Sequence, residues 1–255
     1  MLCSRRPAGA RGGFTLLELL ASIAVVALLM GLMLPALGKV RGRAMQASTH
    51  SRMRQCGQIL GVYASDWKGA FPAFLDPSKS SWTLSVRSEG VSIEIEKYFL
   101  SGMVWNVALA DAYFDGKPTS EVFYSAEQVS RDGPGGVPFV LPCVLFADPA
   151  FWKLETRTGP AQYRATYHHQ VAYPSEKAVL VSIGGLLAPE GEPAPAVNTP
   201  VPRVAADGSV RTIPMDEYAP GCGSGEGMYE QSIHAFDAFV ALHTVGGVRG
   251  RDDPG

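Results

Sequence analysis

Hydrophobic and polar residues separate sharply in the first part of the chain. Residues 1–13 carry three arginines and no acidic residue, whereas in residues 14–34 the one charged side chain is Glu18. A helix of about 20 residues, at about 1.5 Å per residue, matches the roughly 30 Å hydrocarbon core of a bilayer. The run also lacks the polar face of a helix that lies on a globular surface. The pattern predicts a basic leader at residues 1–13 and a membrane-spanning helix at residues 14–37.

A second helical pattern follows directly. Residues 39–67 contain no proline, and their apolar side chains recur at three- and four-residue steps, as in an amphipathic helix. Pro35 lacks an amide hydrogen and clashes with the preceding turn, so it predicts a kink, with a helix end as the alternative. A Gly then Pro signal at residues 68–72 predicts the end of the stalk helix. We expect this helix at residues 38–68, packed on the globular domain through a stripe of Val40, Ala44, Ala47, Met53, Cys56, Leu60, Tyr63 and Trp67.

Short segments between turn signals make up residues 69–255. Residues 201–213 predict a hairpin around Asp207-Gly208, because a tight turn needs positive φ. Segments 130–138 and 184–202 are rich in glycine and proline and predict loops. Other strand candidates are Ser92–Glu96, Glu121–Tyr124, Val137–Phe146 and Lys177–Ile183, the last being the best candidate for a central strand.

Composition and charge exclude some classes of protein. With 46% hydrophobic and 18% charged residues, the 255-residue chain is neither disordered nor a polytopic membrane protein. The formal net charge of −2 gives no bulk basic surface, so no nucleic-acid partner is expected.

None of the four cysteines lies in a C-x-x-C pair. Cys143 and Cys222 could form a disulfide if the domain lies outside the cytoplasm, and the alternative is two separate thiols.

Glu18 is the most informative residue of the apolar run. An unpaired carboxylate inside a bilayer costs about 3 kcal/mol or more, so it is a functional candidate. Cleavage between Gly13 and Phe14 would create an α-amino group one helical turn before Glu18. This cation could pair with the carboxylate of a neighbouring chain, and each charge would offset the desolvation of the other.

The stretch Gly13-Phe14-Thr15-Leu16-Leu17-Glu18-Leu19-Leu20 resembles the processing site of type IV prepilins and type II secretion pseudopilins. The resemblance implies that a prepilin peptidase cuts after Gly13 and methylates Phe14, and that Glu18 guides assembly. Pro35 falls where this family often has a helix-kinking proline. The implied partners are the peptidase, other pilin or pseudopilin subunits, the inner-membrane assembly platform and membrane lipid.

The expected fold is therefore α+β and pilin-like, partly by analogy with that family. The long N-terminal helix would first span the membrane and then serve as the stalk. It would pack on a small antiparallel sheet within a C-terminal domain at residues 69–255. That domain would face the periplasm or the cell exterior, although Lys39, Arg41 and Arg43 after the span leave its orientation open by charge alone.

The apolar run has three alternative interpretations, and each explains less of it. An ordinary secretory signal peptide, with a small-residue cleavage site at residues 36–38, has a shorter apolar region and no acid. A plain single-span anchor explains the length of the run but neither Gly13-Phe14 nor Glu18. A buried core helix would show a polar face, and this run has none.

Two further stretches are similar to pilin-like proteins that are abundant in planctomycetes. The first covers residues 53–72, where the helix ends in a Tyr-Ala-x-Asp-like turn before a proline. The second is Ala206-Asp207-Gly208, which in that family follows a histidine by about ten residues, although residues 196–201 of this chain contain none. The tail at residues 243–252 also resembles the end of those proteins.

The sequence contains no motif for catalysis, a metal or a cofactor. It has no Gly-x-Ser-x-Gly, no phosphate loop and no His-Glu-x-x-His. His168 and His169 are adjacent, so in a strand they would face opposite ways. His234 and Asp237 could share a helix face, and a solvated or packed pair is the favoured interpretation. Solvated acids are likewise favoured over a calcium site at Asp207, Asp216 and Glu217.

The leading functional hypothesis is structural: a pilin-like or pseudopilin subunit, not an enzyme, whose N-terminal helix assembles into a type IV pilus or a type II secretion pseudopilus. The alternative is a minor tip pilin that binds a secreted substrate, a carbohydrate or DNA. A weaker alternative is a membrane-tethered periplasmic enzyme, which a cleft with convergent histidine and acidic groups would support.

Overall fold

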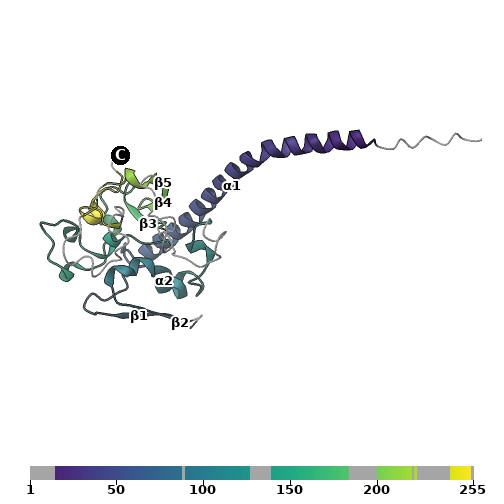
Figure 1. Ribbon diagram of the computed structural model, residues 1–255. Coiled ribbons are helices and arrows are strands. Elements are labelled where there is room, and N and C mark those ends of the chain that lie inside the picture. The colour runs from purple at the N-terminus through teal and green to yellow at the C-terminus, as the bar shows by residue number, and fades with distance from the viewer. Residues whose placement is uncertain are drawn as a thin grey trace, which may run out of the picture. The chain divides into compact units, whose positions relative to one another are not determined.

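The computed structural model describes residues 15–87, 90–126, 139–183, 200–219, 221–222 and 242–253 (Figure 1). The chain divides into two compact units, Met1–Ala44 and Met45–Gly255. The order of regular elements is one long helix, a two-stranded hairpin, a short helix and a three-stranded sheet. This is the α+β fold that the sequence predicts.

The long helix α1 (Leu16–Asp66) is a single helix of 51 residues. The predicted membrane segment and the predicted stalk are thus parts of one element, and Pro35 lies inside it. One proline removes one helical hydrogen bond and crowds one turn, and helix-forming sequence on both sides lets the helix continue. A kink at Pro35 stays a prediction.

The second half of α1 contributes one side to the core of the larger unit. Its buried residues follow three- and four-residue steps and are Thr49, Met53, Cys56, Leu60, Tyr63 and Ala64. The predicted stripe is correct over Met53–Tyr63 and wrong at both ends. Val40 is 61% exposed and Trp67 is 58% exposed, and Ala44 and Ala47 are exposed as well. Apolar spacing alone does not show where the contact with the rest of the fold begins.

The end of α1 is set by a left-handed turn. Lys68 and Gly69 have φ angles of 55° and 84°. The amide of Gly69 donates to the carbonyl oxygen of Ala64 at 2.7 Å, which caps the last turn. The stop that the sequence predicts at residues 68–72 is confirmed.

The three-stranded sheet has the order β3-β4-β5 and is antiparallel throughout. β4 (Pro200–Ala205) and β5 (Val210–Pro214) form the hairpin predicted around Asp207-Gly208, and Gly208 has a φ of 82°. β3 (Ala178–Val181) is buried at all four residues. It lies at the end of the strand order and not in the centre, with an isolated bridge between Val181 and Val140 on its other side.

A separate hairpin, β1 (Trp82–Val86) with β2 (Val91–Ile95), packs beside α2 (Trp105–Tyr113). β2 confirms the strand predicted at Ser92–Glu96. Val86, Val107 and Ala110 form the small buried cluster between the hairpin and α2. The predicted loop at residues 130–138 and residues 184–199 of the loop predicted at 184–202 lie outside the described residues. The last three residues of the second loop are the start of β4, so the loop prediction is wrong there.

Two strand predictions are wrong. Glu121–Phe123 is a 3₁₀ helix. Side chains of α1 donate hydrogen bonds to two of the backbone carbonyl groups that a partner strand would need. Cys56 Sγ donates to the oxygen of Val122, and Arg52 donates to the oxygen of Tyr124 at 3.3 Å.

The apolar run predicted as a strand at Val137–Phe146 also ends as a 3₁₀ helix, Cys143–Phe146. Pro142 precedes this helix and has no amide hydrogen to extend a ladder. The prediction of burial is correct, since residues 139–146 are buried among the aromatic side chains of the main core. Those aromatic residues include Tyr98, Phe99, Phe151, Trp152 and Tyr163.

Candidate membrane-anchoring and processing site

Thr15 and Glu18 form a reciprocal cap at the start of α1. The backbone amide and the hydroxyl of Thr15 each donate to Oε2 of Glu18 at 2.9 Å. The amide of Glu18 in turn donates to the Thr15 hydroxyl at 3.2 Å. This is a capping box, and it satisfies two amides that a helix start leaves without partners. It also holds a carboxylate where the helix dipole is positive.

Thr15 is a capping residue of this site that the sequence prediction missed. Its spacing to Glu18, Thr-x-x-Glu before an apolar run, is the signal for a capping box. The cap places the Glu18 carboxylate at the backbone of Thr15, the residue directly after Gly13-Phe14. Gly13 and Phe14 themselves lie outside the described residues.

The first half of α1 presents apolar side chains on every face. From Leu16 to Val40 its large apolar residues are between 49% and 81% exposed. Exposed apolar surface of this extent marks a contact with a membrane or another protein. Among the described residues, one helix is long and apolar enough to cross a membrane, and it is α1. The helix form suits that environment because its backbone groups bond to one another.

The disulfide considered for Cys143 and Cys222 is not present in the structure. Both are free thiols. Cys143 Sγ contacts the oxygen of Phe99, and burial raises the pKa of this thiol to about 12. Cys222 Sγ accepts from the Arg157 guanidinium at 2.9 Å. Burial raises the pKa of Cys222 more than Arg157 lowers it.

His50, His168 and His169, which lie in the described part of the chain, each have a different neighbour. His168 stacks on Phe71, with ring centroids 4.2 Å apart, whereas His169 stacks on Tyr167. Both belong to the 3₁₀ helix His168–Gln170 and not to a strand. His50 contacts Thr212 of β5 at 2.6 Å. His234 and Asp237 lie outside the described residues.

The acids considered for calcium have other roles or positions. Asp207 accepts a hydrogen bond from the amide of Ser209 at 2.9 Å and so shapes the hairpin turn. Asp216 and Glu217 lie in the 3₁₀ helix Met215–Glu217. In the part of the chain that the structure describes, no three His, Cys, Asp or Glu residues are grouped as a metal site would require.

Comparison with known families identifies the N-terminal segment. Residues 9–34 match the family model for the prokaryotic N-terminal methylation motif. The match includes Gly13, Phe14 and Glu18, and it supports a type IV pilin-like precursor with a single membrane anchor. This motif is structural and not enzymatic. No curated protein and no solved structure matches the chain.

Proposed function

We propose that the protein is a pilin-like or pseudopilin subunit that prepilin peptidase cuts between Gly13 and Phe14. The single observation that carries the proposal is the methylation-motif match at residues 9–34, in register with an exposed apolar helix. The mature chain would begin with methylated Phe14. Residues 14–37 would span the membrane, residues 38–68 would form the stalk and residues 69–255 the globular domain.

The exposed apolar side chains of α1 would provide the surface through which subunits assemble. Side chains such as Leu28 and Leu32, at 67% and 69% exposed, are buried by lipid before assembly and by neighbouring helices within a filament. Removal of such a side chain from water into either environment is favourable by about 1.5–3 kcal/mol, so this segment does not stay in contact with water. The partners are therefore other copies or related subunits, together with membrane lipid and the inner-membrane assembly platform.

Glu18 would set the register between subunits. Its carboxylate is the one acidic group in the apolar segment, and the new α-amino group of Phe14 would be the nearest cation on a neighbouring chain. A charge pair in a low-dielectric environment is strong only where its geometry is good, so the pair favours one axial offset over others. The capping box with Thr15 holds the carboxylate in place before the neighbour arrives.

The subunit would be anchored in the inner membrane by one helix before it joins a filament. Its globular domain would lie in the periplasm or outside the cell. A type II secretion pseudopilus and a type IV pilus both fit. The helix end at residues 63–72 and the hairpin at residues 206–208 support the planctomycete-type subgroup. A role at the filament tip is favoured by a polar pocket in the globular domain, between residues 148–156 and 245–250.

The test is mass spectrometry of the N-terminal peptide of the membrane-extracted protein. A peptide that begins with N-methylated Phe14 is the expected result. A chain that still carries residues 1–13, or that begins after residue 38, would overturn the proposal.

A further inference from the structure

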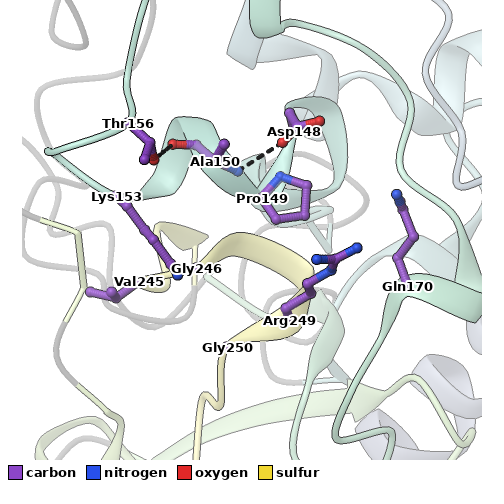
Figure 2. A pocket seen from close by; sticks show the side chains of 10 residues that line it. All are labelled: Asp148, Pro149, Ala150, Lys153, Thr156, Gln170, Val245, Gly246, Arg249 and Gly250. Atoms are coloured by element: carbon purple, nitrogen blue, oxygen red, sulfur yellow. Dashed lines mark hydrogen bonds between the residues drawn. The ribbon is translucent and has the colours of Figure 1, made fainter.

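A polar pocket lies in the larger unit, between residues 148–156 and the C-terminal turn at residues 245–250. Its volume is about 430 Å³, within the range of small-molecule sites, and it opens to solvent. Figure 2 shows Lys153 and Thr156 on one side, Arg249 on another and Gln170 at the edge. The pocket is far in sequence from the apolar part of α1 and takes no part in the proposed assembly through that helix, so a ligand in it would bear on the proposed role at the filament tip.

The side chains that line the pocket carry more positive than negative charge. Lys153 and Arg249 are both exposed and line it. The one acidic residue, Asp148, is already engaged: Oδ1 accepts from the Ala150 amide at 2.8 Å, and Oδ2 pairs with Arg164. Burial alone would raise the pKa of Asp148, but the hydrogen bonds from Ala150 and Arg164 and the nearby charge of Arg249 lower it overall. Asp148 therefore stays ionised, and Lys153 and Arg249 are the two cations of the lining.

The C-terminal wall of the pocket is rigid. Gly246 and Gly247 have φ angles of 77° and 61°. A Cβ at Gly247 would lie 2.6 Å from the Trp152 ring, and one at Gly250 would lie 2.0 Å from the oxygen of Val245. The amide of Gly246 donates to the oxygen of Trp152 at 3.0 Å. The turn is thus held by backbone contacts that leave no room for side chains.

Both ends of this turn are anchored in the core. His243 is buried and stacks on Trp152, with ring centroids 5.7 Å apart. After the turn, Asp252 is buried and bonds to Lys177 and to the amide of Ala178. A wall that is fixed before a ligand arrives lowers the entropy lost on binding. The glycines of the tail are accounted for by these backbone angles and close contacts.

The polar groups of the pocket define the chemistry that fits it. Arg249 offers a planar fork for a carboxylate, and Lys153 adds a second cation. Gln170 uses its Oε1 to accept from the Tyr167 amide, which leaves its NH₂ group to donate. Thr156 uses its hydroxyl hydrogen on the oxygen of Ala150, which leaves its lone pairs to accept. Asp148 also has acceptor capacity beyond its two partners.

We propose that this pocket binds a sugar acid, with the carboxylate on Arg249 and Lys153 and the ring hydroxyls on Asp148, Thr156 and Gln170. A simple inorganic anion would use the cations and leave the remaining polar groups without a role. A neutral sugar would leave the two cations without a partner. Pro149, Ala150 and Val245 add apolar groups to the lining.

The test is a ligand-observed NMR titration of the detergent-solubilised full chain with trigalacturonate, galactotriose and inorganic phosphate. Trigalacturonate is expected to bind, galactotriose to bind at least tenfold more weakly, and phosphate to compete only at much higher concentration. Arg249→Gln is expected to weaken trigalacturonate binding by about tenfold or more, since charge-assisted bonds are the strong ones. Lys153→Gln is expected to weaken it less.

The matched control is Arg211→Gln, which removes the same charge from an exposed position on β5 outside the pocket. It is expected to leave binding unchanged. Equal binding of galactotriose, competition by phosphate at the same concentration as trigalacturonate, or equal weakening by Arg211→Gln and Arg249→Gln would each overturn the proposal. So would a lack of saturable trigalacturonate binding. None of these outcomes bears on the cleavage at Gly13, which is tested separately.

Discussion

The Nζ atom of Lys177 lies 2.8 Å from Oδ1 of Asp252, and both side chains are completely buried. Lys177 also donates to the Thr244 hydroxyl at 2.9 Å, and Oδ2 of Asp252 accepts from the Ala178 amide at 2.6 Å. Removing one member leaves the other charged and without water. This pair therefore joins the C-terminal tail to the start of β3.

We expect Asp252→Asn to lower the free energy of unfolding by about 3–5 kcal/mol, the usual cost of breaking a buried pair. Urea unfolding of the detergent-solubilised protein, followed by tryptophan fluorescence, measures it. The control is Glu121→Gln, which breaks the partly exposed pair with Arg52 and is expected to cost less than about 1 kcal/mol. Equal losses in the two variants would contradict a structural role for the buried pair.

His243 makes the stability of the larger unit depend on pH. Burial, with a smaller effect from Arg157, lowers the pKa of this histidine from 6.5 to about 4. Between these values the unfolded chain binds a proton that the folded chain does not, so acidification favours unfolding. The free energy of unfolding is expected to fall by about 3 kcal/mol from this residue as pH drops from about 6.5 to about 4.

The check is urea unfolding at pH 7, 5.5 and 4.5 for the native chain and for His243→Phe, which keeps an aromatic ring against Trp152 but cannot titrate. The variant is expected to lose less stability on acidification than the native chain. Burial also lowers the pKa of His168, so some pH dependence is expected to remain. Parallel pH profiles would contradict the assignment to His243.

Two glycines of α1 provide a test of close packing. A Cβ at Gly57 would lie 2.8 Å from Cγ1 of Val204, whereas no atom lies within 4 Å of the same position at Gly61. Gly61→Ala is expected to stabilise the protein by about 0.5–1 kcal/mol, because alanine is the better helix former. Gly57→Ala is expected to destabilise it by about 1 kcal/mol or more through overpacking. Thermal unfolding by near-UV circular dichroism separates the two, and a gain at both sites would refute the contact with β4.

Gly13→Ala is expected to stop processing, so that full-length precursor accumulates in the membrane fraction. Gly12→Ala is the control, since it makes the same chemical change one residue before the proposed cut. Immunoblotting with a C-terminal tag resolves the 13-residue difference. Normal maturation of the Gly13 variant would remove the cut-site assignment.

Glu18→Ala is expected to leave processing intact and to reduce the amount of sheared filament at least severalfold, since the intersubunit charge pair is lost. Thr15→Ala removes the Thr15 hydroxyl from the cap and keeps the carboxylate, so its effect on assembly is expected to be smaller. The loss of an N-cap costs about 1 kcal/mol. Filaments of normal abundance from the Glu18 variant would count against the pairing.

The parts of the fold that sequence predicts well are those set by local chemistry. The apolar run, the stop at Gly69 and the hairpin at Asp207-Gly208 each follow from a few neighbouring residues. The strand prediction at Glu121–Tyr124 is wrong because its carbonyl partners come from α1, some 70 residues away in sequence. β3 has the apolar run of a central strand and is last in the strand order, because the segment on its other side, around Val140, makes only an isolated bridge to Val181.

The candidate sites also differ in how far they can be predicted from neighbouring residues alone. The processing motif is contiguous and can be identified from Gly13, Phe14 and Glu18. The pocket at Arg249 combines segments about 100 residues apart, and no pattern within either segment marks it. Buried Lys177 and Asp252 look like ordinary surface charges in the sequence, because only the folded chain brings them together.

The continuity of α1 limits how the globular domain can be separated from its anchor. Met53, Cys56 and Leu60 belong both to the helix that carries the apolar segment and to the core of the larger unit. A protease that cut α1 at any point C-terminal to Met53 would separate part of that core from the domain instead of releasing the domain intact. A form released from the membrane with its core complete would therefore have to begin before Met53, and before Thr49 if it is to keep all the buried residues of α1.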